Sequence, residues 1–202
     1  MKIIGLTGQT GAGKGLFSKA LKESGIPCLD TDITARQVVE KGKPCLTCLT
    51  EAFGNEILLP DGSLDRKKLG AIAFSDKEKL CLLNSITHKY ISQQVNAWLC
   101  EQKEKGCVAA VIDAPQLFES GIDKICDVTV AVLSDEKTRF SRILLRDNIT
   151  EEYARKRMAS QKDDEFFISR CTHIIYNNED EQALKNKAAD FVSKYITNEG
   201  MK

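Results

Sequence analysis

IIGLTGQTGAGKGL, residues 3–16, contains the strongest structural signal in this sequence of 202 residues. Residues 2–7 are mostly apolar and predict a buried strand, whereas the apolar residues of 14–23 have helical spacing. Between them Gly8, Gly13 and Lys14 stand at the spacing GxxxxGK. A glycine-rich loop between a strand and a helix can wrap its backbone N–H groups around phosphate, and the helix dipole and a lysine add positive charge. The loop GQTGAGK, residues 8–14, is therefore predicted to bind phosphate through Lys14 and the amides of residues 11–16, and we call it the phosphate loop.

One position departs from the P-loop motif. Gly15 stands where a Ser or Thr hydroxyl would coordinate magnesium. Two explanations stay open: magnesium is held by water and acidic side chains alone, or ATP turnover is impaired. A tight strand–helix turn with a solvated lysine would explain the same residues without a ligand. The place of the loop, directly after the first strand, favours phosphate binding.

The rest of the chain predicts a three-layer α/β fold. The unbroken apolar runs VAAVI (108–112) and VTVAVL (128–133) are typical of parallel strands covered on both faces. With shorter strands at 26–29 and 174–176, we expect about five parallel strands. Helices are expected through Ala35, Val38 and Val39, and over about 65–74, 76–105, 135–169 and 181–195. Residues 42–75 are the least regular, because glycine and proline interrupt them.

Composition narrows the function classes. The chain has 29 basic and 29 acidic residues, so nothing indicates a nucleic-acid or membrane-surface partner. No apolar run reaches the roughly 18 residues that a membrane span needs. Eight cysteines without a signal peptide favour a reduced, cytoplasmic protein. Cysteines in apolar stretches are expected to act as small hydrophobic residues: Cys28, Cys81, Cys107 and Cys126. Cys45 and Cys48 form a CxxC without the second pair that a zinc site needs.

Six ordered segments, besides the phosphate loop, resemble the dephospho-coenzyme A kinase family. They are Asp30-Thr31-Asp32 with Arg36; Leu64-Asp65-Arg66; Ile86-Thr87-His88; DAPQLFE at 113–119; Arg139, Arg142 and Arg146 followed by Arg157 and Gln161; and Ile175 with Asn177 and Asn178. Two positions depart from the family pattern, since Lys89 replaces a proline and Gln116 replaces a leucine. The resemblance covers residues 3 to about 195.

The resemblance implies a single P-loop kinase domain over 1–197, with a helical substrate-binding insertion at about 33–105 and a lid at about 137–165. It implies transfer of a phosphoryl group from ATP, with Mg²⁺, to the ribose 3′-hydroxyl of dephospho-coenzyme A. Asp32 would be the general base, and Arg142 and Arg146 would steady the transferred group. The ATP site would contain Gly11, Ala12, Gly13, Lys14, Gly15, Leu16 and Asn177. The acceptor site would contain Asp32, Arg36, Arg66, His88, Asp113, Leu117, Phe118 and Glu119. Asp32 and Asp113 would reach magnesium through water. A small-molecule substrate, no nucleic acid, no membrane, and a monomer or weak homo-oligomer are expected.

Simpler roles remain open for most of these residues. Asp30 and Asp32 could cap the following helix, and Asp113 could cap the turn at Pro115. His88 could be a packed histidine, and the arginines could form a solvated helix face. Spacing does not decide which arginine reaches phosphate. Two other functions also stay open: a different nucleoside or nucleotide kinase, and a nucleotide-binding protein that has lost catalysis because of Gly15.

Overall fold

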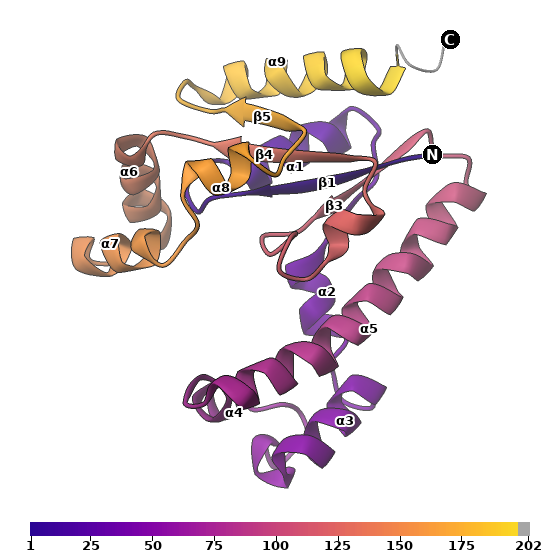
Figure 1. Ribbon diagram of the computed structural model, residues 1–202, viewed down its shortest axis with the longest axis vertical. Coiled ribbons are helices and arrows are strands. Elements are labelled where there is room, and N and C mark those ends of the chain that lie inside the picture. Colours follow the sequence, from indigo (N-terminus) through magenta and orange to yellow (C-terminus); the bar gives the residue numbers. More distant parts are fainter. Residues whose placement is uncertain (198–202) are drawn as a thin grey trace. The chain divides into compact units, whose positions relative to one another are not determined.

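The computed structural model describes residues 1–197 of the chain. These residues form two compact units (Figure 1). The first unit contains Met1–Leu29 and the described residues from Glu101 onward, and the second is Asp30–Cys100. Each unit is described by itself below.

A five-stranded sheet is the centre of the first unit, with the strand order β2-β3-β1-β4-β5. The strands are β1 (Lys2–Gly8), β2 (Cys28–Asp30, which ends at the unit boundary), β3 (Ala109–Asp113), β4 (Val128–Leu133) and β5 (His173–Tyr176). β1 pairs in parallel with β3 on one side, where Ile4 lies opposite Val111, and with β4 on the other. β4 pairs in parallel with β5. The predicted parallel α/β sheet is thus confirmed.

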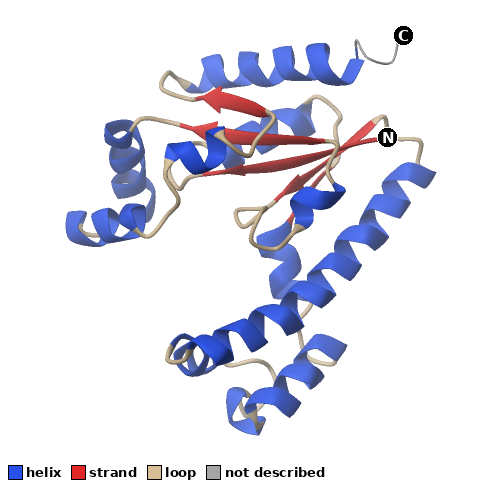
Figure 2. Ribbon diagram, viewed as in Figure 1, coloured by secondary structure: helices blue, strands red, loops and turns tan. Residues whose placement is uncertain are grey.

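Helices cover both faces of this sheet (Figure 2), and apolar side chains pack between them and the strands. On one face, α1 (Lys14–Glu23) and α9 (Glu181–Val192) pack against β1 and β4 through Phe17 and Phe191, whose ring centroids are 6.1 Å apart. Phe17 is completely buried, so its truncation to alanine would cost about 3–5 kcal/mol. On the other face, Phe167 of α8 (Asp164–Ile168) packs on Leu133. Short turns complete this unit: η2 (Ile122–Ile125) and the π-helical η3 (Ser193–Thr197).

The lid region contains three helices in place of the single helical stretch expected over 135–169. They are α6 (Glu136–Asp147), α7 (Glu151–Ala159) and α8. Asn148 ends α6 in the left-handed conformation, with φ 48°. The side chains of Thr150 and Asp163 then cap the next two helices by accepting hydrogen bonds from backbone N–H groups. These capping residues were visible in the sequence, and they explain the two breaks.

The second unit is helical. Its elements are α2 (Thr31–Gln37), α3 (Pro44–Phe53), η1 (Asn55–Ile57), α4 (Arg66–Phe74) and α5 (Lys77–Glu104), whose last turn lies beyond the unit boundary. Helix α3 corrects the expectation of an irregular segment at 42–75, because Pro44 occupies its first turn and Gly54 ends it. Leu49 and Phe53 of α3 pack with Ile57 and Leu69 in a separate hydrophobic core.

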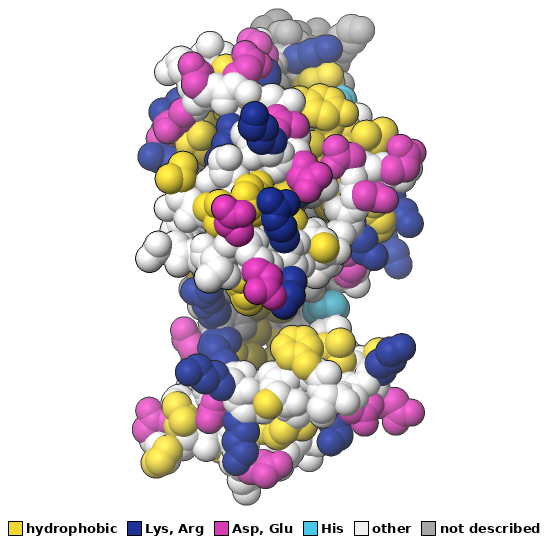
Figure 3. Space-filling model, turned by 90° about the vertical axis from the view of Figure 1, so that its left-hand side faces the viewer, with side chains coloured by type: hydrophobic (Ala, Val, Ile, Leu, Met, Phe, Trp, Pro, Cys, Tyr) yellow, Lys and Arg dark blue, Asp and Glu magenta, His cyan; other side chains and the backbone are white. Residues whose placement is uncertain are grey.

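All eight cysteines are free thiols. Burial raises the pKa of Cys126 to about 12, which keeps its thiol protonated. Cys81 is exposed, contrary to the expectation that it packs as a small hydrophobic residue. Among the described helices, none combines the length and the apolar character that crossing a membrane requires. Basic and acidic side chains are interspersed on the face of the first unit that carries α6 and α7 (Figure 3).

Candidate active site

The phosphate loop has the backbone shape that phosphate binding requires. Gly13 has φ 97° and stands directly before α1, so the N-terminus of this helix faces the end of the loop. A side chain at Gly13 would collide with the Nδ2 atom of Asn177. Ala12 N donates within the loop to Gln9 O at 3.2 Å, and Leu16 N donates to Gly13 O at 3.0 Å. The N–H groups of Gly11, Gly13 and Lys14 make no such bond within the described residues, which leaves them available to a phosphate ligand.

Lys14 forms an ion pair with Asp113, the last residue of β3. The Asp113 side chain is 6% exposed, whereas that of Lys14 is 19% exposed and keeps partial access to solvent. The carboxylate therefore holds the ammonium group beside the phosphate loop. A bound phosphate would compete with Asp113 for the same cation.

Asn177 fixes the loop from the neighbouring end of the sheet. This residue follows β5, is buried, and donates from Nδ2 to the carbonyl of Ala12 at 2.7 Å. Arg142 of α6 in turn donates to the carbonyls of Asn177 and Glu179, at 2.9 Å each. Asn177, predicted to contact ATP, therefore supports the phosphate loop through the Ala12 carbonyl. Arg142 in turn is hydrogen-bonded to the backbone at Asn177 and Glu179.

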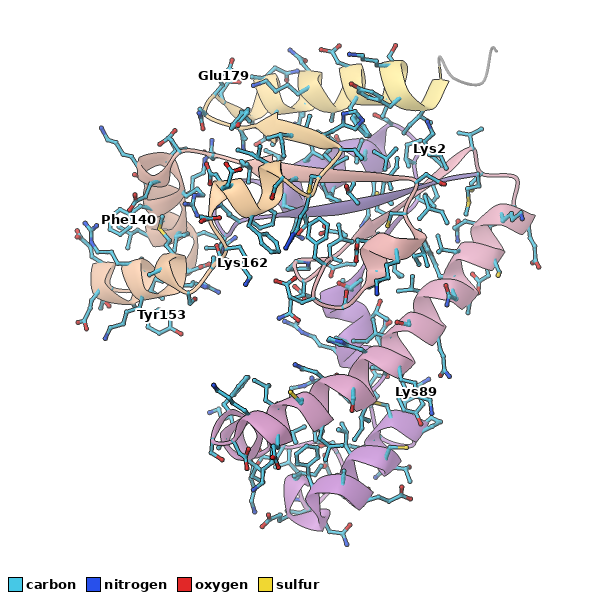
Figure 4. All side chains as sticks on the ribbon, viewed as in Figure 1. Lys2, Lys89, Phe140, Tyr153, Lys162 and Glu179 are labelled. Atoms are coloured by element: carbon cyan, nitrogen blue, oxygen red, sulfur yellow. The ribbon has the colours of Figure 1, made fainter. Side chains whose placement is uncertain are left out.

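Arg146, the other arginine predicted to be catalytic, lies in an exposed ionic cluster. Its guanidinium donates to both carboxylate oxygens of Asp147, at 2.7 and 2.8 Å. Arg157 of α7 reaches the same carboxylate at 2.5 Å. The hydrogen bonds from Arg146 are the main cause of the lowered pKa of Asp147. The cluster joins α6 to α7, and the Phe140 ring under Arg155 forms a second link, with the guanidinium 4.5 Å from the ring centroid (Figure 4).

Residues 161–164 are tied to the start of the phosphate loop. Thr10 N donates to Gln161 Oε1 at 2.8 Å. Gln9 Nε2 donates to the carbonyl of Lys162 at 3.1 Å and to Asp164 Oδ1 at 2.9 Å. Gln9 had not been selected from the sequence, because it occupies a variable position of the motif. Only its distant partners in the fold reveal its role.

Asp30 and Asp32, at the start of the second unit, differ in their surroundings. Asp30 caps α2, since its side chain accepts from Asp32 N at 2.8 Å and Ile33 N at 3.2 Å. Asp32 is exposed in the first turn of α2, and the structure records no hydrogen bond to its carboxylate from the described residues. Arg36 and Arg66 are also exposed, and Arg66 Nη2 donates to Arg36 O at 3.2 Å. His88 lies partly buried on α5.

The segment after β3 divides between core and surface. Leu117 is fully buried and lies where a side chain on Gly5 of β1 would be, so it packs in the core, and its contact with substrate stays a prediction. Phe118 and Glu119 instead line a pocket of about 450 Å³ with Lys162, Phe166 and Arg170. The rings of Phe118 and Phe166 meet edge to face, with centroids 5.7 Å apart.

The described residues contain no cluster of side chains that could coordinate magnesium by itself. They hold no group of three or more His, Cys, Asp or Glu side chains suited to a metal. Gly15 is exposed and offers no side chain. These residues fit an ion that takes its ligands mainly from ATP and water, as Mg²⁺ does in kinases.

Comparisons with known proteins agree with this geometry. Residues 2–183 match the family described as Dephospho-CoA kinase. A dephospho-CoA kinase of Corynebacterium efficiens is 38% identical over 194 residues, covering 96% of this chain and 97% of that protein. A crystal structure from Thermus thermophilus superposes with a TM-score of 0.82 at 25% identity, covering 96% and 97% of the two chains. Dephospho-CoA kinase from Campylobacter jejuni shares the fold, with a TM-score of 0.74 at 22% identity over 98% of this chain and all of that one. The chain described here belongs to the dephospho-CoA kinase family.

Proposed function

We propose which residues of this chain carry out the reaction of its family, the ATP-dependent phosphorylation of dephospho-coenzyme A in coenzyme A biosynthesis. The observation that carries the proposal is the phosphate loop with Lys14 beside it, in a chain that matches the family over residues 2–183. Lys14 and N–H groups within residues 11–16, those of Gly11, Gly13 and Lys14 first, hold the phosphates of ATP. Asn177 supports the loop through the carbonyl of Ala12.

Asp32 is the proposed general base. The oxygen of the ribose 3′-hydroxyl attacks the γ-phosphorus, the bond from that phosphorus to the bridging oxygen of ADP breaks, and the hydroxyl proton passes to the Asp32 carboxylate. Two features support this role. Asp32 lies two residues after the end of β2, near the edge where parallel α/β sheets place catalytic groups, and Asp30 caps the helix. Arg36, Arg66, His88, Phe118 and Glu119 are proposed to bind the acceptor.

Mg²⁺ is proposed as the second cofactor. It would neutralise phosphate charge when bound, with Asp113 and Asp32 holding some of its water molecules. We also propose a cytoplasmic enzyme that is a monomer or a weak homo-oligomer. No nucleic acid or membrane takes part in the proposed reaction.

A coupled assay for ADP release tests the proposal. Purified enzyme is given ATP and Mg²⁺ with dephospho-coenzyme A, adenosine or AMP as the acceptor. ADP release with dephospho-coenzyme A alone is the expected result. Preference for adenosine or AMP would favour another kinase, and absence of turnover with all three, despite ATP binding, would favour a nucleotide-binding protein without catalysis.

A further inference from the structure

Two amide side chains from distant parts of the chain hold the backbone of the phosphate loop. One is Asn177, which donates to the carbonyl of Ala12. The other is Gln161, whose Oε1 accepts from Thr10 N at 2.8 Å. Gln161 lies in residues 160–163, which connect α7 to α8 (Figure 1) and which we call the return segment. It resembles part of the family's lid region, but no role in binding either substrate has been assigned to it above.

Gln9 makes the reverse connection, from the loop to the return segment. Its Nε2 donates to the carbonyl of Lys162 at 3.1 Å and to Asp164 Oδ1 at 2.9 Å, which uses both N–H groups of the amide. Turned around, the amide would place its oxygen against those same two oxygen atoms. Gln9 is 4% exposed, so its side chain is enclosed by the fold. The three hydrogen bonds between loop and return segment span 151 to 155 residues of sequence.

These contacts bear on the N–H groups that are available to phosphate. Gln161 takes the N–H of Thr10, directly before that of Gly11, which makes no such bond within the described residues. At Gly11 the loop also packs against α6, since a Cβ atom there would lie 2.7 Å from the carbonyl oxygen of Arg139. A run of backbone N–H groups can surround an anion only while the backbone keeps its curvature. The lid region therefore fixes the loop at the point where its available N–H groups begin.

The two glutamines use opposite ends of their amides. Gln161 accepts through its oxygen, whereas Gln9 donates through its nitrogen. A carboxylate at position 161 would keep the accepting oxygen. A carboxylate at position 9 would lose both donors and face the Lys162 carbonyl and the Asp164 carboxylate. The same substitution therefore has a different effect at each position.

We propose that Gln9 and Gln161 are positioning residues for ATP, because they fix the phosphate loop to the return segment and so keep its N–H groups directed at phosphate. This inference rests on the proposed function. Each glutamine acts through the backbone of the loop and not through contact with the reacting atoms. Binding of ATP therefore depends on both side chains, whereas binding of the acceptor, which is assigned to other residues, does not.

Titration with a non-hydrolysable ATP analogue and Mg²⁺ tests the proposal on Gln161→Met, Gln161→Glu, Gln9→Met and Gln9→Glu. We expect each methionine variant to bind the analogue roughly tenfold more weakly than wild type, as for loss of a hydrogen bond that shapes the site. Gln161→Glu should bind more tightly than Gln161→Met, and Gln9→Glu more weakly than Gln9→Met. The KM for dephospho-coenzyme A should stay at the wild-type value in all four. Gln182→Met is the matched control, since Gln182 Nε2 donates to Asn186 on its own helix at 3.0 Å.

Three results would overturn the inference. Wild-type affinity in both methionine variants, with a lowered melting temperature, would assign the glutamines to stability alone. Weaker binding by the glutamate variant than by the methionine variant at both positions would show that added charge decides the affinity. If the Gln9 variants do not fold, the exposed Gln161 still decides, because Gln161→Glu must bind more tightly than Gln161→Met. These titrations contain no acceptor, and wild type stays active on dephospho-coenzyme A whatever their result, so failure here is distinct from failure of the proposed function.

Discussion

Asp30 and Asp32 carry the same side chain two positions apart, but their carboxylates have different surroundings. The Asp30 carboxylate caps the N-terminus of α2 by accepting backbone hydrogen bonds, whereas Asp32 is exposed. We predict that Asp32→Asn lowers kcat by roughly 10²-fold or more with little change in ATP affinity, because a general base contributes about that much. Steady-state kinetics and an ATP titration measure both quantities. Near-normal kcat would remove Asp32 from the mechanism.

Gly15 leaves the phosphate loop without the hydroxyl that usually binds magnesium. A Cβ atom at this position meets no other atom within 4 Å, so a serine fits without displacing its surroundings. Its hydroxyl would supply the magnesium ligand that glycine lacks. We therefore expect Gly15→Ser to reach half-maximal rate at lower free magnesium than wild type, at saturating ATP.

Two results would contradict that expectation. Superimposable magnesium curves would mean that another protein group already replaces the hydroxyl, with Asp113 and Asp32 the first to examine. Activity that exists only in Gly15→Ser would instead support the interpretation that this chain has lost catalysis. Gly15→Ala is the matched control, because it adds the Cβ atom without a ligand.

Among the elements, β5 and the residues that follow it determine the shape of the phosphate loop. Asn177→Ala would leave the Ala12 carbonyl without its donor, and the loss of one buried hydrogen bond costs about 1–2 kcal/mol. We predict an ATP affinity that is weaker by roughly tenfold. Calorimetric titration measures the affinity, and Asn178→Ala is the control, since Asn178 Oδ1 accepts from Asp135 N and not from the loop. Equal affinity in both variants would show that the loop holds its shape unaided.

The elements also show where sequence reasoning succeeds. The strands were predictable because unbroken apolar runs have few alternatives, and Gly8, Gly13 and Lys14 placed the loop at the end of β1. Helix α3 was missed, although Pro44 and Gly54 are ordinary start and stop signals. The contacts of Gln9 and Asn177 could not be predicted, because their partners lie far away in the sequence. Leu117 was assigned to the substrate because of the family motif, and its burial against Gly5 is visible only in the fold.

For the whole molecule, we expect His173 of β5 to make the free energy of unfolding depend on pH. Burial, followed by repulsion from Lys194 and Lys2, lowers its pKa in the folded state. The folded protein therefore resists protonation that the unfolded chain accepts, so stability is complete above about pH 6.5 and decreases as the pH falls below that value. We predict that the melting temperature of wild type decreases as the pH falls below about 6.5, and that the melting temperature of His173→Phe decreases less over the same pH range. Parallel curves for the two proteins would assign the pH dependence to other groups.

The strand order has a consequence for how the protein is made on the ribosome. β1 leaves the ribosome before both of its neighbours, β3 and β4, which begin more than 100 residues later in the chain. The hydrogen bond from Asn177 to Ala12 spans 165 residues. At synthesis rates of about 5–20 residues per second, the first strand therefore waits roughly ten to thirty seconds before that contact can form. A nascent chain interrupted before β5 should retain no nucleotide, and the apolar IIGL segment is then open to chaperones during this interval.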